Sequence, residues 1–524
     1  MNIHTLIKPS EYHDSVTLMT VARELAIYPG VVDAAVIMGT EANLSILKQA
    51  GLYSAGVDKV SPNDLVIAFR APDAIAQKVF QEAERLLSQK PANEGKVGEY
   101  RPKTIEAAVK ANPDANVAVI SVSGRYATVE AWKALRKGLH VLLFSDNVSL
   151  EDEVALKKYA SGQGLLLMGP GAGTVLLNGV ALGFANAIPA GPVGIVSAAG
   201  TGLQEVSTLL AKNGIGITQG LGTGGRDLNE EVGGIMMLAG LKVLQADPDT
   251  KVIALVSKPP SKGVAEVILD QVACRNKPTV IGFMGSNPAD WTAVPNAIPA
   301  GTLEETALLA AKAAGANMEE PQRIIARRTE ELRLKAQELR AKLKPGQDYL
   351  RGLYSGGTLC FEAQAIWRDL LSEPVFSNAP LRKENRLPDS TRSQGHSAVD
   401  LGEEEFTVGR LHPMIDNDLR IRRLLQEARD PRVAVIIFDV VLGYGAHPNP
   451  ASELGPAARR AIEYAKSEGR ELFIIASVTG TEQDPQSLSK QSAMLADNGV
   501  ILCESNAAAA RLAGMIVCQE RGGK

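Results

Sequence analysis

The 524-residue chain is poor in the residues that most often carry chemistry, with four cysteines, six histidines and 4% aromatic residues. The cysteines lie far apart, without the spacing of metal ligands, at Cys274, Cys360, Cys503 and Cys518. This pattern predicts free thiols in a reducing cytoplasm and no metal site. With so few histidines, no hydrolytic triad can be assembled from the order of residues alone.

Strong charge and long apolar runs are absent as well. The formal net charge is −4, which excludes the dense basic surface that binds nucleic acid by counterion release. No apolar stretch reaches the length of about 20 residues that crosses a bilayer. The start, Met1–Thr5, lacks the basic and apolar parts of a secretory signal. We therefore expect a cytoplasmic protein without nucleic-acid or membrane partners.

The chain is instead rich in glycine and in ordinary core residues. Hydrophobic residues make up 45% of the sequence, which also holds 49 glycines. A chain of this length buries several cores. Abundant glycine with few aromatic residues is typical of α/β domains, which contain many tight turns.

The hydrophobic pattern predicts an α/β chain. Residues 1–95 alternate three strand-like and three helix-like runs, one of them a helix at 41–50, and predict a small α+β domain of ferredoxin-like type. A polar linker follows at 89–101. Beyond it, short apolar runs without alternation indicate strands buried on both faces of parallel sheets. These runs are Val117–Val122, Val141–Phe144, Leu165–Met168, Val193–Val196, Ile215–Gln219, Val252–Val256, Thr279–Phe283, Leu350–Tyr354, Ala398–Leu401, Val433–Val441, Glu471–Ala476 and Val500–Leu502.

Two features divide this region into domains. The glycine-rich turn Gly169–Gly173 marks a boundary between two sheets. The charged run Met318–Lys344 predicts one long solvated helix that joins two halves. The predicted parts are the α+β domain at 1–95, a Rossmann-like domain of CoA-binding type at 96–187, a flavodoxin-like domain at 188–317, a helical linker at 318–348 and a second flavodoxin-like domain at 349–524.

Two glycine-threonine loops, each placed where a strand leads into a helix, are the most informative motifs. A helix start leaves backbone N–H groups unpaired and carries partial positive charge, so glycines there let an anion approach. Such turns also need glycine for structural reasons alone. Two of them in separate halves nevertheless favour a single phosphate held from both sides. The residues assigned to phosphate binding are Ser197, Gly200, Thr201, Gly202, Ser355, Gly356, Gly357 and Thr358.

Two histidines are candidate catalytic residues. His447 follows the apolar run Val433–Val441, at the carboxyl end of a parallel strand, where ligands bind. His412 stands before a helix-like run. Either could instead be a structural hydrogen-bonding residue. Cys360, on the first turn after the second loop, would be reactive if exposed, and burial as a small hydrophobic residue is the alternative.

Three other segments carry weaker signals. Gly220–Gly225 fits the pattern GxGxxG, but no acidic residue follows at the usual distance, so a backbone turn is expected and not an NAD site. Ser390–Ser393 is similar to the phosphate loop of transcarbamylases, but it leads into a strand, and the match is interpreted as chance. The polar stretch Ser377–Ser397 is expected to be a long functional or disordered loop.

Residues 117–260 resemble the α-subunit of succinyl-CoA synthetase. The resemblance lies in Leu167–Pro170, in the loop Val193–Thr201, in Gly222–Asp227 and in Ala246–Thr250. It implies that Glu205 occupies the position of the family's glutamate that faces the phosphorylated group.

The rest of the chain extends this resemblance. Residues 349–516 resemble the carboxyl-terminal domain of the β-subunit, including Ser355–Thr358 and Asp400–Gly402. Over its full length the chain is similar to FdrA proteins, which are commonly labelled acyl-CoA synthetases. The resemblance implies tandem Rossmann-like and flavodoxin-like domains of the succinyl-CoA synthetase type. It also implies two helices that face one phosphate site.

The departures from that family limit what the chain can do. The family carries phosphate on a histidine, but the matching region Trp291–Ala297 has none. The glycine-rich turn that receives coenzyme A is replaced by residues 1–90, and no segment can supply the ATP-grasp domain. We therefore expect no coenzyme A as cofactor and no complete ligase cycle in this chain alone.

The resemblance to FdrA proteins, which are associated with allantoin (purine) breakdown, implies an enzyme. It implies a carbamoyltransferase subunit that acts on carbamoyl phosphate and oxamate or oxalurate, in a hetero-oligomer with co-encoded subunits. Aligned N–H groups would stabilise the departing phosphate, and Glu205, His447 and His412 are the catalytic candidates. One alternative is an acyl-CoA ligase that uses other chains for nucleotide and histidine. Another is a non-catalytic sensor of an acyl phosphate or CoA.

Overall fold

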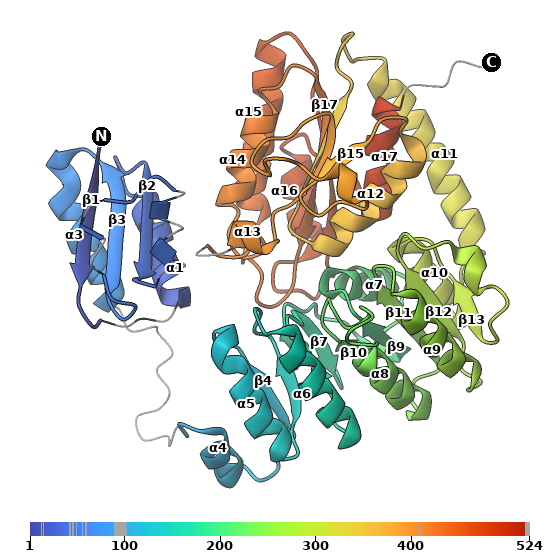
Figure 1. Ribbon diagram of the computed structural model, residues 1–524. Coiled ribbons are helices and arrows are strands. Elements are labelled where there is room, and N and C mark those ends of the chain that lie inside the picture. The colour runs from blue at the N-terminus through green and yellow to red at the C-terminus, as the bar shows by residue number, and fades with distance from the viewer. Residues whose placement is uncertain are drawn as a thin grey trace. The chain divides into compact units, whose positions relative to one another are not determined.

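The computed structural model describes residues 1–518, except residues 12, 14, 41–42, 45–46, 49, 55, 58–59, 89–101 and 408–409. The chain divides into two compact units, one of residues 1–101 with 403–412 and one of 102–402 with 413–524 (Figure 1). The predicted linker at 89–101 and the boundary predicted at residue 95 lie outside the described residues. So do five positions of the helix predicted at 41–50.

The first unit contains a small α+β domain, as the sequence predicts. Its sheet has the order β1-β3-β2, and β3 is antiparallel to both neighbours. Side chains of β3 alternate between two cores, because Ile67 and Phe69 pack under the helices while Val66 and Ala68 pack on the opposite face. The elements are β1 (Asn2–Lys8), α1 (Ser15–Ala26), β2 (Asp33–Met38), β3 (Leu65–Ala71) and α3 (Asp73–Ser88).

The second unit begins with a three-stranded parallel sheet of order β4-β5-β6. The turn Gly169–Gly173, predicted to mark a boundary between two sheets, leads from β6 into the next sheet, whose first strands at 174–183 fall inside the domain predicted at 96–187. Gly169 needs its positive φ of 120°, and a Cβ atom there would lie 2.2 Å from the Leu143 carbonyl oxygen. The elements are α4 (Ile105–Ala111), β4 (Val117–Ile120), α5 (Gly124–Arg136), β5 (His140–Leu143), α6 (Leu150–Gly162) and β6 (Leu167–Met168).

A seven-stranded sheet of order β13-β12-β11-β9-β10-β7-β8 follows. Its strands β9 to β13 are parallel, and β9 to β12 overlap the predicted strands, whereas β13 was not predicted. Gly220–Gly222, expected to be part of a backbone turn, instead belong to β10. The elements are β7 (Thr174–Leu177), β8 (Val180–Gly183), β9 (Ala190–Ser197), α7 (Gly200–Lys212), β10 (Ile217–Gly222), α8 (Ile235–Ala246), β11 (Val252–Ser257), α9 (Lys262–Ala273), β12 (Thr279–Phe283), η2 (Pro288–Trp291), β13 (Ala297–Pro299) and α10 (Leu303–Ala313).

The antiparallel hairpin β7–β8 at the edge of this sheet was not predicted. Its turn is Asn178-Gly179, with φ values of 48° and 80°. Asparagine-glycine between two short apolar runs is the strongest short-range hairpin signal. The sequence therefore contained the signal, although each strand has only four residues.

The last sheet has six strands in the order β15-β16-β14-β17-β18-β19, all parallel. The three-residue strand β15 was not predicted. The elements are β14 (Tyr349–Tyr354), α12 (Gly357–Leu370), β15 (Val375–Ser377), η3 (Lys383–Asn385), β16 (His396–Asp400), α14 (Asp418–Glu427), β17 (Val433–Val441), α15 (Ala451–Ser467), β18 (Phe473–Thr479), α16 (Leu488–Ala496), β19 (Ile501–Cys503) and α17 (Asn506–Val517).

Two predictions about connecting segments need correction. The charged helix exists as α11 (Pro321–Arg340), but it is not solvated all round, because it packs on α17 and buries Ile324, Ala336 and Leu339. The polar stretch 377–397 is not one long loop without structure, because it contains η3 and hydrogen-bonds to α14. It holds α14 in place, since Arg423 donates to the Ser390 carbonyl oxygen at 2.7 Å and to Ser393 Oγ at 2.8 Å.

We call residues 174–313 the first half and residues 349–517 the second half of this unit. One hydrophobic cluster runs through both halves and includes Leu203, Leu359 and Ala509. Helices α7 and α10 of the first half pack on α12 and α17 of the second. The halves therefore share a core, and their helices meet at its centre.

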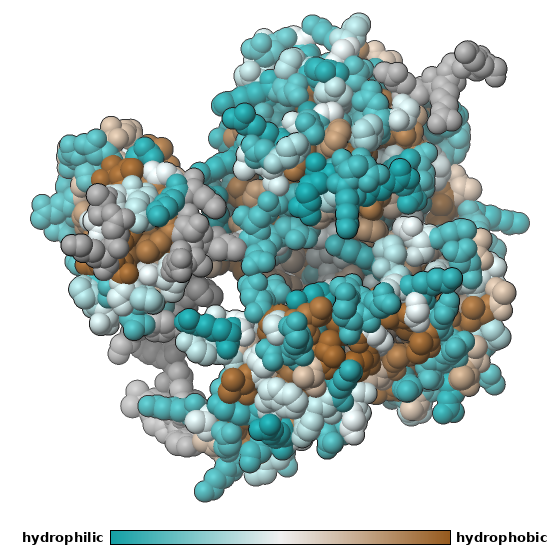
Figure 2. Space-filling view, in the orientation of Figure 1, coloured by the Kyte–Doolittle hydropathy of each residue, from teal (hydrophilic) through white to brown (hydrophobic). Residues whose placement is uncertain are grey.

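The surface of the second unit is mostly hydrophilic in the view of Figure 2, and its apolar residues gather around α6 and α8. Among the residues that the structure describes, no helix is both long enough and apolar enough to span a membrane.

Candidate anion site

The structure brings the two predicted loops together, because α7 and α12 meet at their N-terminal ends. A Cβ atom at Gly356 would lie 2.8 Å from Thr201 Cγ2, and a Cβ atom at Gly202 would lie 3.0 Å from Thr358 Cγ2. Each threonine therefore packs against a glycine of the opposite loop. The glycines serve the close approach of two helices as well as any ligand.

This packing qualifies the prediction that a single phosphate is held between the loops from both sides. Thr201 fills the space over Gly356, so an anion has no room at that point. Of the eight residues assigned to phosphate, Gly200 and Gly357 are half-buried and the other six are buried. Each of these two glycines is the first residue of its helix. An anion from solvent would therefore reach the site at Gly200 and Gly357.

The first loop keeps its helix-start donors open. Ser197 Oγ shapes the turn, since it donates to the Ala199 carbonyl oxygen at 2.7 Å and accepts from the Ala199 N–H at 3.1 Å. The prediction that Ser197 binds phosphate is therefore not supported by its geometry. The N–H groups of Gly200, Thr201 and Gly202 have no hydrogen-bond partner in the described part of the chain.

The second loop is partly filled by a carboxylate of the protein. Asp439, on β17, accepts hydrogen bonds from the Ser355 N–H at 2.7 Å, from Ser355 Oγ at 2.9 Å and from the Gly356 N–H at 2.8 Å. Arg420 Nη2 lies 3.2 Å from the same carboxylate. The assignment of Ser355 and Gly356 to phosphate is thereby corrected, because their donors are already used.

Three N–H groups remain available at the start of α12. Those of Gly357, Thr358 and Leu359 make no hydrogen bond to any described residue. Asp400 borders them, since its Oδ2 would lie 2.5 Å from a Cβ atom at Gly357. The two helix starts together offer six N–H donors, and the protein's own carboxylates stand beside the second.

Glu205 does not point toward the open donors. It is the sixth residue of α7 and is 1% exposed. Its Oε1 accepts from the N–H of Asn506, the first residue of α17, at 2.9 Å, and its Oε2 accepts from Thr479 Oγ1. This geometry corrects the expectation that Glu205 is catalytic, because its carboxylate does not face the open donors and binds the second half of the protein instead.

Glu362 is the counterpart that the sequence patterns did not reveal. It is the sixth residue of α12, and its Oε1 accepts from the N–H of Leu303, the first residue of α10, at 2.6 Å. Its Oε2 accepts from Asn506 Nδ2 at 2.8 Å. Burial raises the pKa of Glu362 to about 7, and the charge of Glu205 adds to the rise. The equal position of both glutamates in their helices was the available signal.

Neither histidine candidate is brought to the helix starts by a contact that the structure shows. His447 Nδ1 accepts from the Asn449 N–H at 3.1 Å, and Nε2 lies 3.4 Å from Glu453 Oε1. These contacts fit the alternative of a structural histidine. His412 belongs to the segment 403–412 of the first unit.

Two further residues near the start of α12 have contrasting surroundings. Cys360 is 1% exposed, and burial raises the pKa of its thiol well above the ordinary value, so the buried alternative holds. Lys258, directly after β11, is half-buried with Nζ 5.6 Å from the Phe361 ring centre. It forms no ion pair or hydrogen bond with any described residue. No sequence pattern predicted it, although it directly follows an apolar strand.

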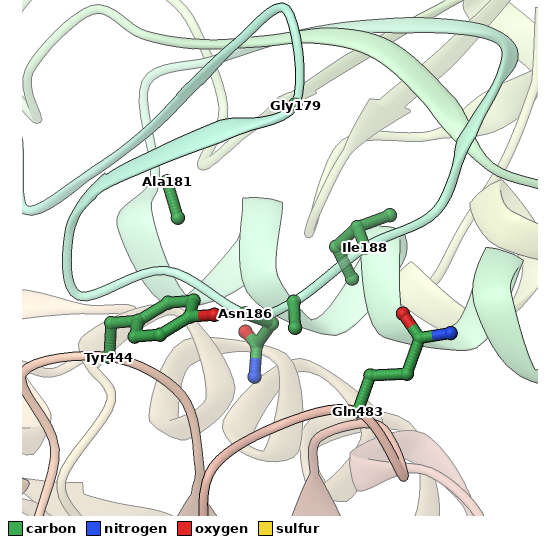
Figure 3. A pocket seen from close by; sticks show the side chains of 7 residues that line it. Gly179, Ala181, Asn186, Ile188, Tyr444 and Gln483 are labelled. Carbon is green, nitrogen blue, oxygen red and sulfur yellow. The ribbon is translucent and has the colours of Figure 1, made fainter.

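A pocket of about 250 Å³ lies elsewhere, between the β7–β8 hairpin and loops of the second half. Figure 3 shows the Tyr444 hydroxyl beside Asn186, with Ile188 and Gln483 to the other side. Asn186 is committed to the protein, since Nδ2 donates to the Leu442 carbonyl oxygen and to Asp484. No lining residue is charged, so this pocket does not suit a phosphate.

Three family models match parts of the chain. They are described as CoA-ligase, over residues 353–516, CoA binding domain, over 190–285, and AllF heavy metal-associated domain, over 1–102. The CoA-binding match falls on the domain predicted at 188–317. It does not fall on the domain predicted to be of CoA-binding type at 96–187.

Individual relatives agree with these matches. YahF of Escherichia coli K12, an uncharacterized protein, is 43% identical over 99% of both chains. The α-subunit of ADP-forming succinate–CoA ligase from Staphylococcus epidermidis is 30% identical over 38% of this chain and 66% of its own length. Dinucleotide-forming acetyl-CoA synthetase 1 of Ca. Korarchaeum cryptofilum, solved with phosphate and ADP, aligns at 15% identity and TM-score 0.31, over 82% of this chain and 87% of that chain. A score this low supports no conclusion about function.

The residues at 1–102 do not fit the heavy metal in the name of the matching model. This segment contains no cysteine. His4 Nε2 lies 3.1 Å from the Ala71 carbonyl oxygen, and His13 Nε2 lies 3.0 Å from Glu11 Oε1. Across the described residues, no group of three or more histidine, cysteine, aspartate or glutamate side chains could hold a metal.

Proposed function

The chain belongs to the succinyl-CoA synthetase-like family that includes YahF of Escherichia coli, and on this premise we propose that it is an enzyme that handles an acyl phosphate. More specifically, we propose a carbamoyltransferase subunit that acts on carbamoyl phosphate and oxamate or oxalurate. The name AllF of the model at 1–102 and the resemblance to FdrA proteins support a place in allantoin breakdown. Coenzyme A is not part of this proposal.

The observation that carries the proposal is the meeting of α7 and α12 with six unpaired N–H groups. Each helix start contributes about half a positive charge. Lys258, which lies over the Phe361 ring of α12, adds a cation that has no carboxylate partner among the described residues. A phosphate dianion at Gly200 and Gly357 would satisfy these donors, which have no partner among the described residues.

In the proposed reaction the amide nitrogen of oxamate attacks the carbonyl carbon of carbamoyl phosphate. A C–N bond forms, the C–O bond to phosphate breaks, and the proton lost by nitrogen leaves with the phosphate. Fixed N–H groups favour this step because they stabilise charge that grows on the departing phosphate oxygens. No residue of this chain is assigned as the base, and a partner subunit could supply it.

An acyl-CoA ligase is the second candidate, favoured by the matches to the CoA-ligase and CoA binding models. It would require partner chains for nucleotide and for the phosphorylated histidine. Residues 286–300, which include η2 and β13, contain no histidine. A non-catalytic sensor of an acyl phosphate or CoA is the third candidate, because the helix starts could bind without turnover.

The test is to purify the chain with its co-encoded neighbours and to measure oxalurate cleavage. We expect cleavage that depends on phosphate and yields carbamoyl phosphate. CoA-dependent ATP hydrolysis with acid-labile phosphate on a histidine would instead establish the ligase. Phosphate binding without any turnover would establish the sensor and exclude the transferase.

A further inference from the structure

Two buried glutamates occupy equivalent places in the two halves of the second unit. Glu205 and Glu362 are each the sixth residue of the helix whose start borders the anion site. Each accepts a hydrogen bond from the first N–H of a helix in the opposite half, Glu205 from Asn506 and Glu362 from Leu303. The arrangement is reciprocal, because each half provides one glutamate and receives one.

Without the glutamates, the first N–H groups of α17 and α10 would lack this hydrogen bond. Among the described residues, Ser505 Oγ accepts only from the third residue of α17, and Thr302 Oγ1 accepts only from the third residue of α10. The first N–H of each helix is therefore left for the carboxylate from the other half. A negative charge at a helix start is also stabilised by the helix dipole.

These contacts anchor the two helices that carry the anion site. Helix α7 belongs to the first half, and Glu205 fixes its second turn to the second half. Helix α12 belongs to the second half, and Glu362 fixes its second turn to the first half. One turn closer to solvent, Thr201 and Thr358 pack against the facing glycines.

We propose that Glu205 and Glu362 are positioning residues of the anion site, which hold the starts of α7 and α12 face to face by capping α17 and α10. They do not touch the anion. They act through the position of Gly200–Gly202 and Gly357–Leu359, whose N–H groups must converge on one ligand. This role rests on the proposed phosphate site, and the reciprocal contact between the halves sets the geometry of that site.

The test compares Glu205→Gln and Glu362→Gln with Glu304→Gln. Glu304 is a suitable control because it is equally buried and joins the halves through Arg511, yet it lies on α10 and its ion pairs go to α11 and α17. The probe is inorganic phosphate, and its binding is measured by calorimetry well below the melting temperature of each variant. We expect about tenfold weaker phosphate binding in the first two variants and a change of less than about twofold in the third.

Glu205→Gln could also fail to fold, so a milder change is included. Thr479→Val keeps the side-chain volume and removes only the hydroxyl that donates to Glu205 Oε2. It should weaken phosphate binding by a few-fold. Hydrogen exchange of the first turns of α10 and α17 should be faster in Glu362→Gln and Glu205→Gln, respectively.

The outcomes separate this inference from the proposed function. If the wild-type chain does not bind phosphate, the anion site and the positioning role are both wrong. If the wild type binds it and the glutamine variants bind equally well, only the positioning role is wrong. If Glu304→Gln loses as much affinity as the other two, general loosening of the halves explains the loss, and the positioning role is again overturned.

Discussion

The starts of α7 and α12 have similar sequences and meet in space, yet their electrostatic surroundings differ. At α7 the only described side chain that hydrogen-bonds to the turn is that of Ser197, and it does so within its own loop. At α12 the carboxylate of Asp439 takes two N–H groups and a hydroxyl, and Asp400 stands beside Gly357. A glycine-threonine loop therefore marks a helix start that can accept an anion, and the rest of the fold decides whether the anion is a ligand or part of the protein.

The largest expected effect comes from removing the internal anion of the second loop. Asp439→Asn would leave the guanidinium of Arg420 buried opposite a neutral amide. Breaking a buried ion pair in this way typically costs about 3–5 kcal/mol, and urea denaturation should show a lower free energy of unfolding by about that amount. The control is Asp430→Asn, since Asp430 pairs with Arg351 and its side chain is 36% exposed. Equal losses in both variants would refute the special role of Asp439.

The first loop is tested by putting a carboxylate where none exists. In Gly200→Asp the new Cβ atom would meet only Thr174 Oγ1, at 3.4 Å, so the fold should survive. Phosphate at 100 times its dissociation constant stabilises a binding protein by about 2.7 kcal/mol, and this gain should vanish in the variant. Thermal unfolding with and without phosphate measures it.

The control for that variant is Gly263→Asp, on the first turn of α9, where a side chain has open space. It should keep the full response to phosphate. Gly357 is unsuitable for the same test, because its Cβ atom would collide with Asp400 Oδ2. A persistent response to phosphate in Gly200→Asp would show that the first loop does not bind the anion.

Replacing Lys258 should have a smaller effect on phosphate binding. Lys258→Met should weaken phosphate binding about tenfold, or about 1.4 kcal/mol, because a cation near the anion is lost. Lys258→Arg should retain most of the affinity. Lys262→Met, four residues away on the exposed start of α9, is the matched control. If calorimetry finds equal affinities for Lys258→Met and Lys262→Met, Lys258 lies outside the site.

The most gradual effect concerns pH. Burial raises the pKa of Glu362 from an ordinary 4.5 to about 7, so the folded state holds this proton more tightly than the unfolded state does. The stability linked to Glu362 is therefore present below pH 4.5 and lost as the pH rises to about 7, by at most about 1.4 kcal/mol per pH unit. The melting temperature of the wild type should fall across this window more steeply than that of Glu362→Gln. Parallel curves would contradict the raised pKa.

Local patterns predicted most of the fold. The strand β17 is a run of apolar residues around Asp439, and the helix α11 is visible in its charged sequence. The strands β13 and β15 were missed because three residues give little pattern, and the hairpin β7–β8 was missed although its Asn178-Gly179 turn was a signal. The solvated character predicted for all of α11 was wrong, because α11 packs on α17, which is distant in sequence, and buries Ile324 and Leu339.

The candidate site was predictable only in part. The two loops could be found because each contains its own glycines and threonine. Their actual partners could not, since Asp439 lies 84 residues from Ser355 and Asn506 lies 301 residues from Glu205. The one local sign was the single aspartate inside the apolar strand β17, because a carboxylate buried in such a strand needs a specific partner.

The reciprocal contacts of Glu205 and Glu362 make the two halves depend on each other. A half produced alone would expose a hydrophobic core face, lose one helix cap and keep a glutamate without its partner. Cutting the chain after α11, by contrast, would remove one covalent link and leave every cap in place. The halves should then recombine as two polypeptides, so that one gene or two could encode the same assembly. The peptide connection would serve to keep the two parts in equal number.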